Sequence, residues 1–144
     1  LSPDSGLDLS DESWPIYARS VDAPPIYMGG DSHVSHSAIN RGCDIEGTVE
    51  NSVLSPRVTI EKGARVSYSV ILPGVTVEAG SVIEYAIIGE GCHIGRECRV
   101  GGMPDSAPGG KWDLTVLAPD CALEDGREIA PGVMLDRYGK EVLK

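Results

Sequence analysis

Aliphatic side chains recur about every six residues through the central part of the chain, residues 52–100. The positions that carry this rhythm are Ile60, Val66, Ile71, Val77, Ile83, Ile88, Ile94 and Val100. The same segment also repeats itself at a longer interval, so that residues 52–56 (SVLSP) align with residues 69–73 (SVILP). This pattern is typical of a hexapeptide repeat and predicts a parallel β-helix in which three short strands make one coil.

The alternation within each repeat gives this prediction a physical basis. Alternate side chains of an extended strand face opposite sides, so Val58 and Ile60 point inward around an outward Thr59. Burying one inward Val or Ile contributes roughly 1.5–3 kcal/mol, but a single coil cannot bury its own face, so the stack is the unit of stability. Corners between strands need residues that adopt or preset unusual dihedral angles. The residues expected at corners are Pro56, Gly63, Pro73, Gly80 and Gly91.

The repeat is interrupted at three places. Residues 1–30 do not repeat and carry proline beside aromatic residues, so we expect an extended interdomain linker that packs along a scaffold or leads in from another domain. A first coil follows, but its alignment with the next coil, Cys43 over Val58, is two positions shorter than that of Val58 over Val75, which predicts a tighter or irregular turn. Residues 101–113 contain two Gly-Gly pairs and two prolines, which indicates a loop inserted into the β-helix domain of residues 31–144.

Composition and charge narrow the class of protein. Hydrophobic residues make up 41% of the 144 residues, yet Phe is absent and aromatic residues reach only 5%, which predicts a narrow aliphatic core. The net charge of −10 argues against nucleic acid or an anionic membrane as a partner, because both demand a basic surface. Without a run of 18 apolar residues or a signal peptide, we expect a soluble, cytoplasmic protein. The chain starts at Leu1 without Met, which suggests a piece of a longer protein.

The four cysteines fall into the repeat. Cys43, Cys92 and Cys121 each precede an inward aliphatic residue by two positions, and Cys98 takes the place of Ala64 in the coil that contains it. No paired C-x-x-C spacing indicates zinc. We therefore expect buried reduced thiols that pack as small hydrophobic side chains, with a disulfide or redox role as the alternative.

Histidines and arginines are the candidates for chemistry or binding. His93 lies between two inward residues and should point outward, where it is either a general base or an ordinary surface histidine. His33 and His36 lie close together without an evident third metal ligand. Arginines on neighbouring coils can gather a phosphate-bearing effector, although salt-bridged surface charge is the simpler interpretation. The arginines proposed for this effector site are Arg41, Arg57, Arg65 and Arg96.

Five stretches, taken in order, resemble the C-terminal part of bacterial glucose-1-phosphate adenylyltransferase (ADP-glucose pyrophosphorylase). They are Asp11 with residues 14–17 (WPIY), residues 24–25 (PP), residues 45–54 (IEGTVENSVL), residues 69–74 (SVILPG) and residues 84–88 (EYAII). The hexapeptides alone fit many families, but the ordered linker and the GTVENSVL string make the match specific. The resemblance covers nearly the full chain and weakens after Gly101.

This resemblance implies a fold and a function. The expected fold is all-β: a single-stranded left-handed parallel β-helix of about five coils, preceded by the extended linker. A nucleotidyltransferase domain, absent from this chain, would make ADP-glucose and pyrophosphate from ATP and glucose 1-phosphate with magnesium, for glycogen synthesis. No catalytic residue, metal ligand or cofactor is therefore expected here. The resemblance implies subunit contacts in a tetramer and part of an allosteric effector site, for a sugar phosphate or another metabolite, next to the catalytic domain.

Two other interpretations stay open. A free-standing hexapeptide acyltransferase would use His93 at a trimer cleft and bind acetyl-CoA. A purely structural solenoid would contribute contacts alone.

Overall fold

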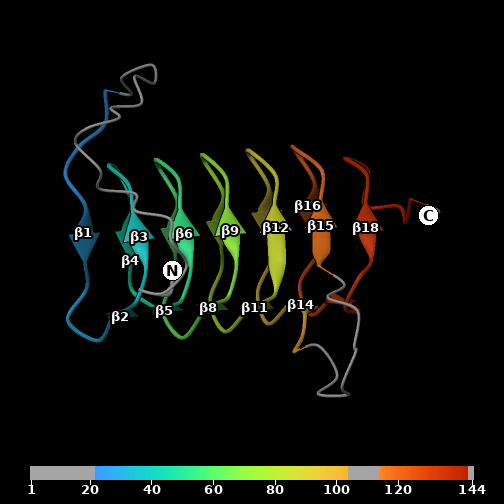
Figure 1. The fold of residues 1–144 in the computed structure, drawn as a ribbon, viewed down its shortest axis with the longest axis horizontal. Helices are drawn as coiled ribbons and strands as arrows, with labels where there is room; N and C mark the ends of the chain where they lie inside the picture. The colour runs from blue at the N-terminus through green and yellow to red at the C-terminus, as the bar shows by residue number, and fades with distance from the viewer. Residues whose placement is uncertain (1–21, 104–113, 143–144) are drawn as a thin grey trace, which may run out of the picture.

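The computed structural model describes residues 22–103 and 114–142. The linker residues 1–21 and most of the predicted loop, residues 104–113, lie outside the described residues. Three parallel six-stranded sheets form a stacked prism, drawn with its axis horizontal in Figure 1. This confirms the predicted all-β fold, a left-handed parallel β-helix of the hexapeptide-repeat type. The stack has about six coils, against about five expected.

Each coil contributes one short strand to each of three sheets, named A, B and C in chain order. The strands of sheet A are β1 (Tyr27–Met28), β4 (Asp44–Ile45), β7 (Thr59–Ile60), β10 (Thr76–Val77), β13 (His93–Ile94) and β16 (Ala122–Leu123). The strands of sheet B are β2 (His33–Ser35), β5 (Thr48–Glu50), β8 (Arg65–Ser67), β11 (Val82–Glu84), β14 (Arg99–Gly101) and β17 (Glu128–Ile129). The strands of sheet C are β3 (Ala38–Ile39), β6 (Val53–Leu54), β9 (Val70–Ile71), β12 (Ala86–Ile88), β15 (Thr115–Leu117) and β18 (Met134–Leu135).

Strand β1 lies inside the stretch assigned to the linker. Tyr27 pairs with Asp44 in parallel register, so the first coil already begins at Tyr27 and supplies the additional coil.

The interior of the prism is aliphatic, as the repeat predicts. The inward residues of the central coils, such as Ile60, Val66 and Ile71, have no exposed surface. Val58, Val75 and Cys92 follow one another in the same column, because Thr59, Thr76 and His93 pair across neighbouring coils. Stacking of equivalent side chains therefore builds the core.

The irregular first turn has a specific location. The corner between β4 and β5 consists of Glu46 and Gly47 alone, whereas the equivalent corner of the next coil, between β7 and β8, runs over residues 61–64. The strands on both sides of the short corner keep their parallel pairing with β7 and β8, so the missing pair of residues is absorbed at this corner. A Cβ on Gly47 would collide with the carbonyl oxygen of Ala64 and lie 2.8 Å from that of Glu61. The shortened corner therefore requires glycine.

The other corners use left-handed backbone conformations. Gly63 and Gly80 have φ angles of 75° and 73° at the corners between sheets A and B. Side chains nevertheless occupy the left-handed position at the corners between sheets B and C, where Tyr68 and Tyr85 have φ angles of 48° and 49°. Such values are uncommon for a residue with a side chain.

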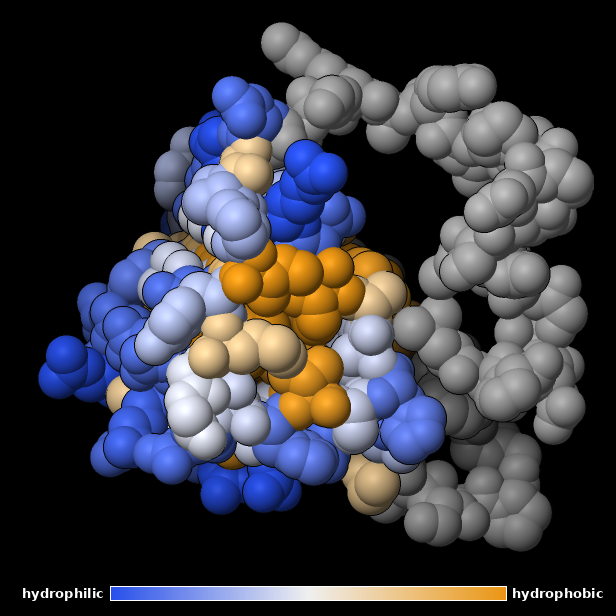
Figure 2. All heavy atoms as spheres, turned by 90° about the vertical axis from the view of Figure 1, so that its left-hand side faces the viewer, coloured by the Kyte–Doolittle hydropathy of each residue, from blue (hydrophilic) through white to orange (hydrophobic). Residues whose placement is uncertain are grey.

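The two ends of the prism differ. At the C-terminal end the chain turns back after β18, where Leu135 forms an antiparallel bridge with Glu141 and the Val142 amide donates to the carbonyl of Met134 at 2.8 Å. At the N-terminal end, Val34 and Ile39 are only partly buried against the core. Figure 2 shows this end with apolar residues at its centre and hydrophilic residues around them.

Among residues 22–103 and 114–142 there is no helix with the length and apolar character needed to span a membrane.

Candidate functional site

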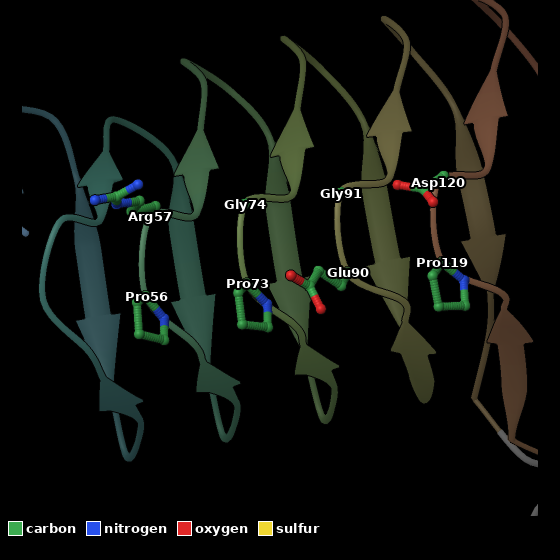
Figure 3. Close-up of a pocket in the computed structure, with 8 residues that line it drawn as sticks. All are labelled: Pro56, Arg57, Pro73, Gly74, Glu90, Gly91, Pro119 and Asp120. Atoms are coloured by element: carbon green, nitrogen blue, oxygen red, sulfur yellow. The ribbon is translucent and has the colours of Figure 1, made fainter. Parts of the chain in front are cut away.

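A groove runs along the edge where the chain passes from sheet C to sheet A, called here the C–A edge. Its volume is about 570 Å³, and it crosses four successive coils (Figure 3). It is lined by Pro56, Arg57, Pro73, Gly74, Glu90, Gly91, Pro119 and Asp120. We call this surface the corner groove.

The local sequence explains the shape of the corner groove. Each coil places a residue with positive φ at this edge, with glycine in two of the four coils, Gly74 and Gly91, and side-chain-bearing residues in the others, Arg57 (φ 62°) and Asp120 (φ 61°). Backbone hydrogen bonds join the corners, for example from the Gly74 amide to the Pro56 carbonyl at 3.1 Å. A proline directly precedes three of these four positions and presets φ before the turn.

The charges in the corner groove are mixed. The Arg57 guanidinium donates from Nη2 to the backbone carbonyl of Asp22 at 2.7 Å, which ties the linker to this edge. Glu90 and Asp120 are exposed carboxylates on the following coils. The lining residues include no Ser, Thr, Cys, Lys or His, and the groove therefore suits binding better than covalent catalysis.

The structure separates the four arginines proposed for an effector. Arg41 and Arg57 lie at successive C–A corners, where the Arg57 amide donates to the Arg41 carbonyl at 3.1 Å. Arg65 projects from β8 on sheet B, and Arg96 lies at a corner between sheets A and B. Arg41 and Arg57 therefore share an edge of the prism, and the other two lie elsewhere.

His93 points outward from β13, as predicted. Its Nε2 lies 2.9 Å from Oε1 of Glu78, whose other oxygen is 3.5 Å from Nε of Arg96. The carboxylate therefore bridges the histidine and the arginine on the surface of sheet A. At another exposed position, Nε2 of His33 lies 4.0 Å from Oε1 of Glu50. No group of three or more His, Cys, Asp or Glu residues in the described part of the chain is arranged to hold a metal ion.

The four cysteines are buried and free, which confirms their predicted packing role. Burial raises the pKa of all four thiols above the usual value, and it raises the pKa of Cys92 to about 11. The Cys92 thiol donates to the carbonyl of Ala118 at 3.1 Å. These thiols are protonated near neutral pH, so they are poor nucleophiles.

Sequence reasoning missed a stacked aromatic pair on the edge between sheets B and C. The rings of Tyr68 and Tyr85 lie 4.8 Å apart and nearly parallel, at 7°. Burial, followed by the neighbouring Tyr68 and Glu84, raises the pKa of Tyr85. The signal was present in the sequence, because the two tyrosines are 17 residues apart, the same interval at which residues 52–56 align with residues 69–73.

Comparison with known families shows to which family this solenoid belongs. Residues 27–115 match the family described as "GlmU-like, C-terminal hexapeptide". This range covers more than half of the chain, so the protein belongs to this family of hexapeptide-repeat domains.

Comparison with individual proteins is more specific. The glucose-1-phosphate adenylyltransferase of Geobacillus stearothermophilus is 48% identical over 66 residues, which are 46% of this chain and 17% of that enzyme. This match confirms the resemblance to that enzyme. The matched region is only about a sixth of the relative's length, and the catalytic activity of the relative is therefore not carried over to this chain.

Solved structures of proteins with other activities have a similar fold. The acetyltransferase domain of PglB from Neisseria gonorrhoeae superposes with a TM-score of 0.64 at 19% identity, over 83% of this chain and 58% of that one. A mutant of perosamine N-acetyltransferase from Caulobacter crescentus, in complex with CoA and GDP-perosamine, superposes with a TM-score of 0.60 at 15% identity, over 85% of this chain and 58% of that one. At these identities the likeness concerns the fold alone.

Proposed function

We propose that this chain is the C-terminal regulatory and oligomerisation domain of a glucose-1-phosphate adenylyltransferase. The full-length enzyme would make ADP-glucose and pyrophosphate from ATP and glucose 1-phosphate in glycogen biosynthesis. Its magnesium would be bound by an N-terminal catalytic domain that these 144 residues do not contain. The observation that carries the proposal is the 48% identity to the Geobacillus enzyme over 66 residues.

The geometry supports a binding role rather than chemistry within the solenoid. The cysteines are buried and protonated, and the corner groove offers backbone, proline and charged side chains but no Ser, Thr, Cys, Lys or His. The domain would act through its contacts with the catalytic domain and with other subunits of a tetramer.

Arg41 and Arg57 are the arginines best placed for an anionic effector. They lie on neighbouring coils at one edge, and both side chains are exposed. One guanidinium nitrogen of Arg57 donates to Asp22, which leaves other donors of the guanidinium for a phosphate group. Arg65 and Arg96 contribute less in this proposal, because Arg65 lies on sheet B and Arg96 is held by Glu78.

The effector role is tested in the full-length enzyme, with inorganic phosphate and a panel of sugar phosphates as probes. We expect Arg41→Ala and Arg57→Ala to raise the half-maximal effector concentration about 5- to 100-fold, the range of typical allosteric coupling. Arg65→Ala is the matched comparison and should raise it less than either of these variants. If all three variants respond like the wild type, the arginines have no effector role, and a purely structural solenoid explains this domain better.

A hexapeptide acyltransferase is the second candidate, and the contact between His93 and Glu78 is the observation that favours it. A carboxylate 2.9 Å from an imidazole nitrogen can orient the ring, as a general base requires. Isothermal titration calorimetry with acetyl-CoA separates the two functions. The adenylyltransferase proposal predicts no binding heat with the 144-residue chain. Saturable binding that is lost in His93→Asn would favour the acyltransferase.

A further inference from the structure

The outward faces of sheets B and C differ sharply in polarity. On sheet C, one outward residue in each coil is apolar. This column consists of Ala38, Val53, Val70, Ile87, Val116 and Met134. We call it the apolar stripe. The corresponding column on sheet B consists of His33, Thr48, Arg65, Val82, Arg99 and Glu128.

The apolar stripe is separate from the core. Leu54, Ile71 and Ile88 in the inward column of sheet C already fill the interior, each with at most 1% exposure. Val70 and Met134 in the stripe are 37% and 40% exposed. None of the described strands of sheet C contains a charged residue, in a chain of which 24% is charged. A contiguous apolar face of this kind indicates a contact surface.

The N-terminal part of the chain is tied to the edge of this face. The Gly42 amide donates to the Pro24 carbonyl at 2.8 Å, and Arg57 holds the Asp22 carbonyl at 2.7 Å. Gly42 and Arg57 lie at the corners that follow the sheet C strands β3 and β6. The chain upstream of Asp22 therefore starts at the border of the apolar stripe.

The upstream sequence has suitable length and chemistry. Trp14, Ile16 and Tyr17 are large apolar or amphipathic residues within residues 1–21. An extended chain spans about 3.3–3.6 Å per residue, so the stretch from Tyr17 to Asp22 reaches about 17 Å. Strands in neighbouring coils are about 4.8 Å apart, and this reach covers roughly three coils.

We propose that the chain's own residues 14–17 dock on the apolar stripe, over strands β6, β9 and β12. Trp14 and Ile16 would cover the side chains of Val70 and Ile87 and remove them from water. Sheet C thus serves as an intramolecular docking face that fixes the direction in which the linker leaves the solenoid. This proposal does not depend on the enzymatic function of any larger protein.

Tryptophan fluorescence tests the docking. The chain contains two tryptophans, so Trp112→Phe leaves Trp14 as the only reporter. In that background we expect Trp14 to be shielded from acrylamide. Val70→Asp should raise its quenching constant several-fold and shift its emission to the red. Val82→Asp is the matched control, because Val82 is the outward valine of sheet B, and it should change neither quantity.

Disulfide cross-linking and the molar mass from light scattering provide two further tests, independent of fluorescence. The pair Ile16→Cys and Val70→Cys should form an intramolecular disulfide under mild oxidation, whereas Ile16→Cys with Val82→Cys should not. This readout does not need the aspartate variant to fold. Trp14 as accessible as in the unfolded chain would overturn the proposal. It would also be overturned if light scattering found a dimer that Val70→Asp converts to a monomer, because a second copy would then cover the stripe.

Discussion

Sheets B and C are built from the same coils, yet they present opposite surfaces. Their inward columns are equivalent, since Ile83 on sheet B and Ile88 on sheet C are both fully buried. Their outward columns differ, because Arg65 and Arg99 stand on sheet B where Val70 and Val116 stand on sheet C. The interior of a solenoid therefore specifies the fold, and the outward positions remain free to specify partners.

The largest expected effect comes from a substitution in the inward column of sheet B. Ile83→Ala on β11 should lower the free energy of unfolding by about 2–5 kcal/mol, because it leaves a cavity in a column with no exposed surface. The neighbouring outward change Val82→Ala should stay within about 0.5 kcal/mol. Urea denaturation of both variants measures the difference. Equal losses would mean that the two faces of β11 contribute alike.

The shortened corner provides the next test. Gly47→Ala places a Cβ against the carbonyl oxygens of Ala64 and Glu61, and this overpacking should cost about 1–3 kcal/mol. Gly30→Ala is the control, because a Cβ there has no neighbour within 4 Å. Thermal denaturation should show a lower midpoint for the first variant alone. An unchanged midpoint for Gly47→Ala would show that this corner tolerates a side chain.

The buried thiols make stability depend on pH in the alkaline range. The pKa of Cys92 is raised from 9.0 to about 11, so the folded state favours the protonated thiol. Its contribution to stability is complete below pH 9 and is lost as the pH rises through about 11. The free energy of unfolding should fall by on the order of 1 kcal/mol across this window, and less in Cys92→Ala. An unfolding free energy that does not change with pH across this window would contradict the burial of these thiols.

The smallest effect is expected on the outer surface of sheet A. His93→Ala removes the contact with Glu78, but the imidazole is 51% exposed, so the loss of stability should not exceed about 1 kcal/mol. Calorimetric unfolding measures this value, with His36→Ala as the comparison. A loss as large as that of Ile83→Ala would show that this surface contact supports the fold.

The sequence was sufficient for the fold because stacking repeats the same contacts. The regular alignment of the coils predicted the strand register, the inward columns and the buried cysteines. The shorter alignment of the first coil indicated an irregular turn, although its dependence on Gly47 follows from the carbonyl of Ala64, which belongs to the neighbouring coil. The number of coils was underestimated because Tyr27 pairs with Asp44 although its own stretch shows no repeat.

The candidate site was harder to predict from the sequence. Arginine spacing alone could not separate Arg41 and Arg57, at the C–A edge, from Arg65 and Arg96, since the edge on which a residue lies depends on corner lengths. The corner groove itself arises from prolines and glycines, whose alignment in the repeat marked turns but not a cavity. The apolar stripe was not predicted: Val53 and Val70 occupy aligned positions of the repeat, but the isolation of their column from charge emerges only when the sheets are compared.

The most direct test of the proposed function is an assay of pyrophosphate release from ATP and glucose 1-phosphate. It compares the 144-residue chain with the full-length polypeptide in which the proposal places it. We expect ADP-glucose synthesis by the full-length polypeptide and none by the isolated chain, whose described residues form a β-solenoid. Turnover by the isolated chain, or its absence from the full-length polypeptide, would contradict this account.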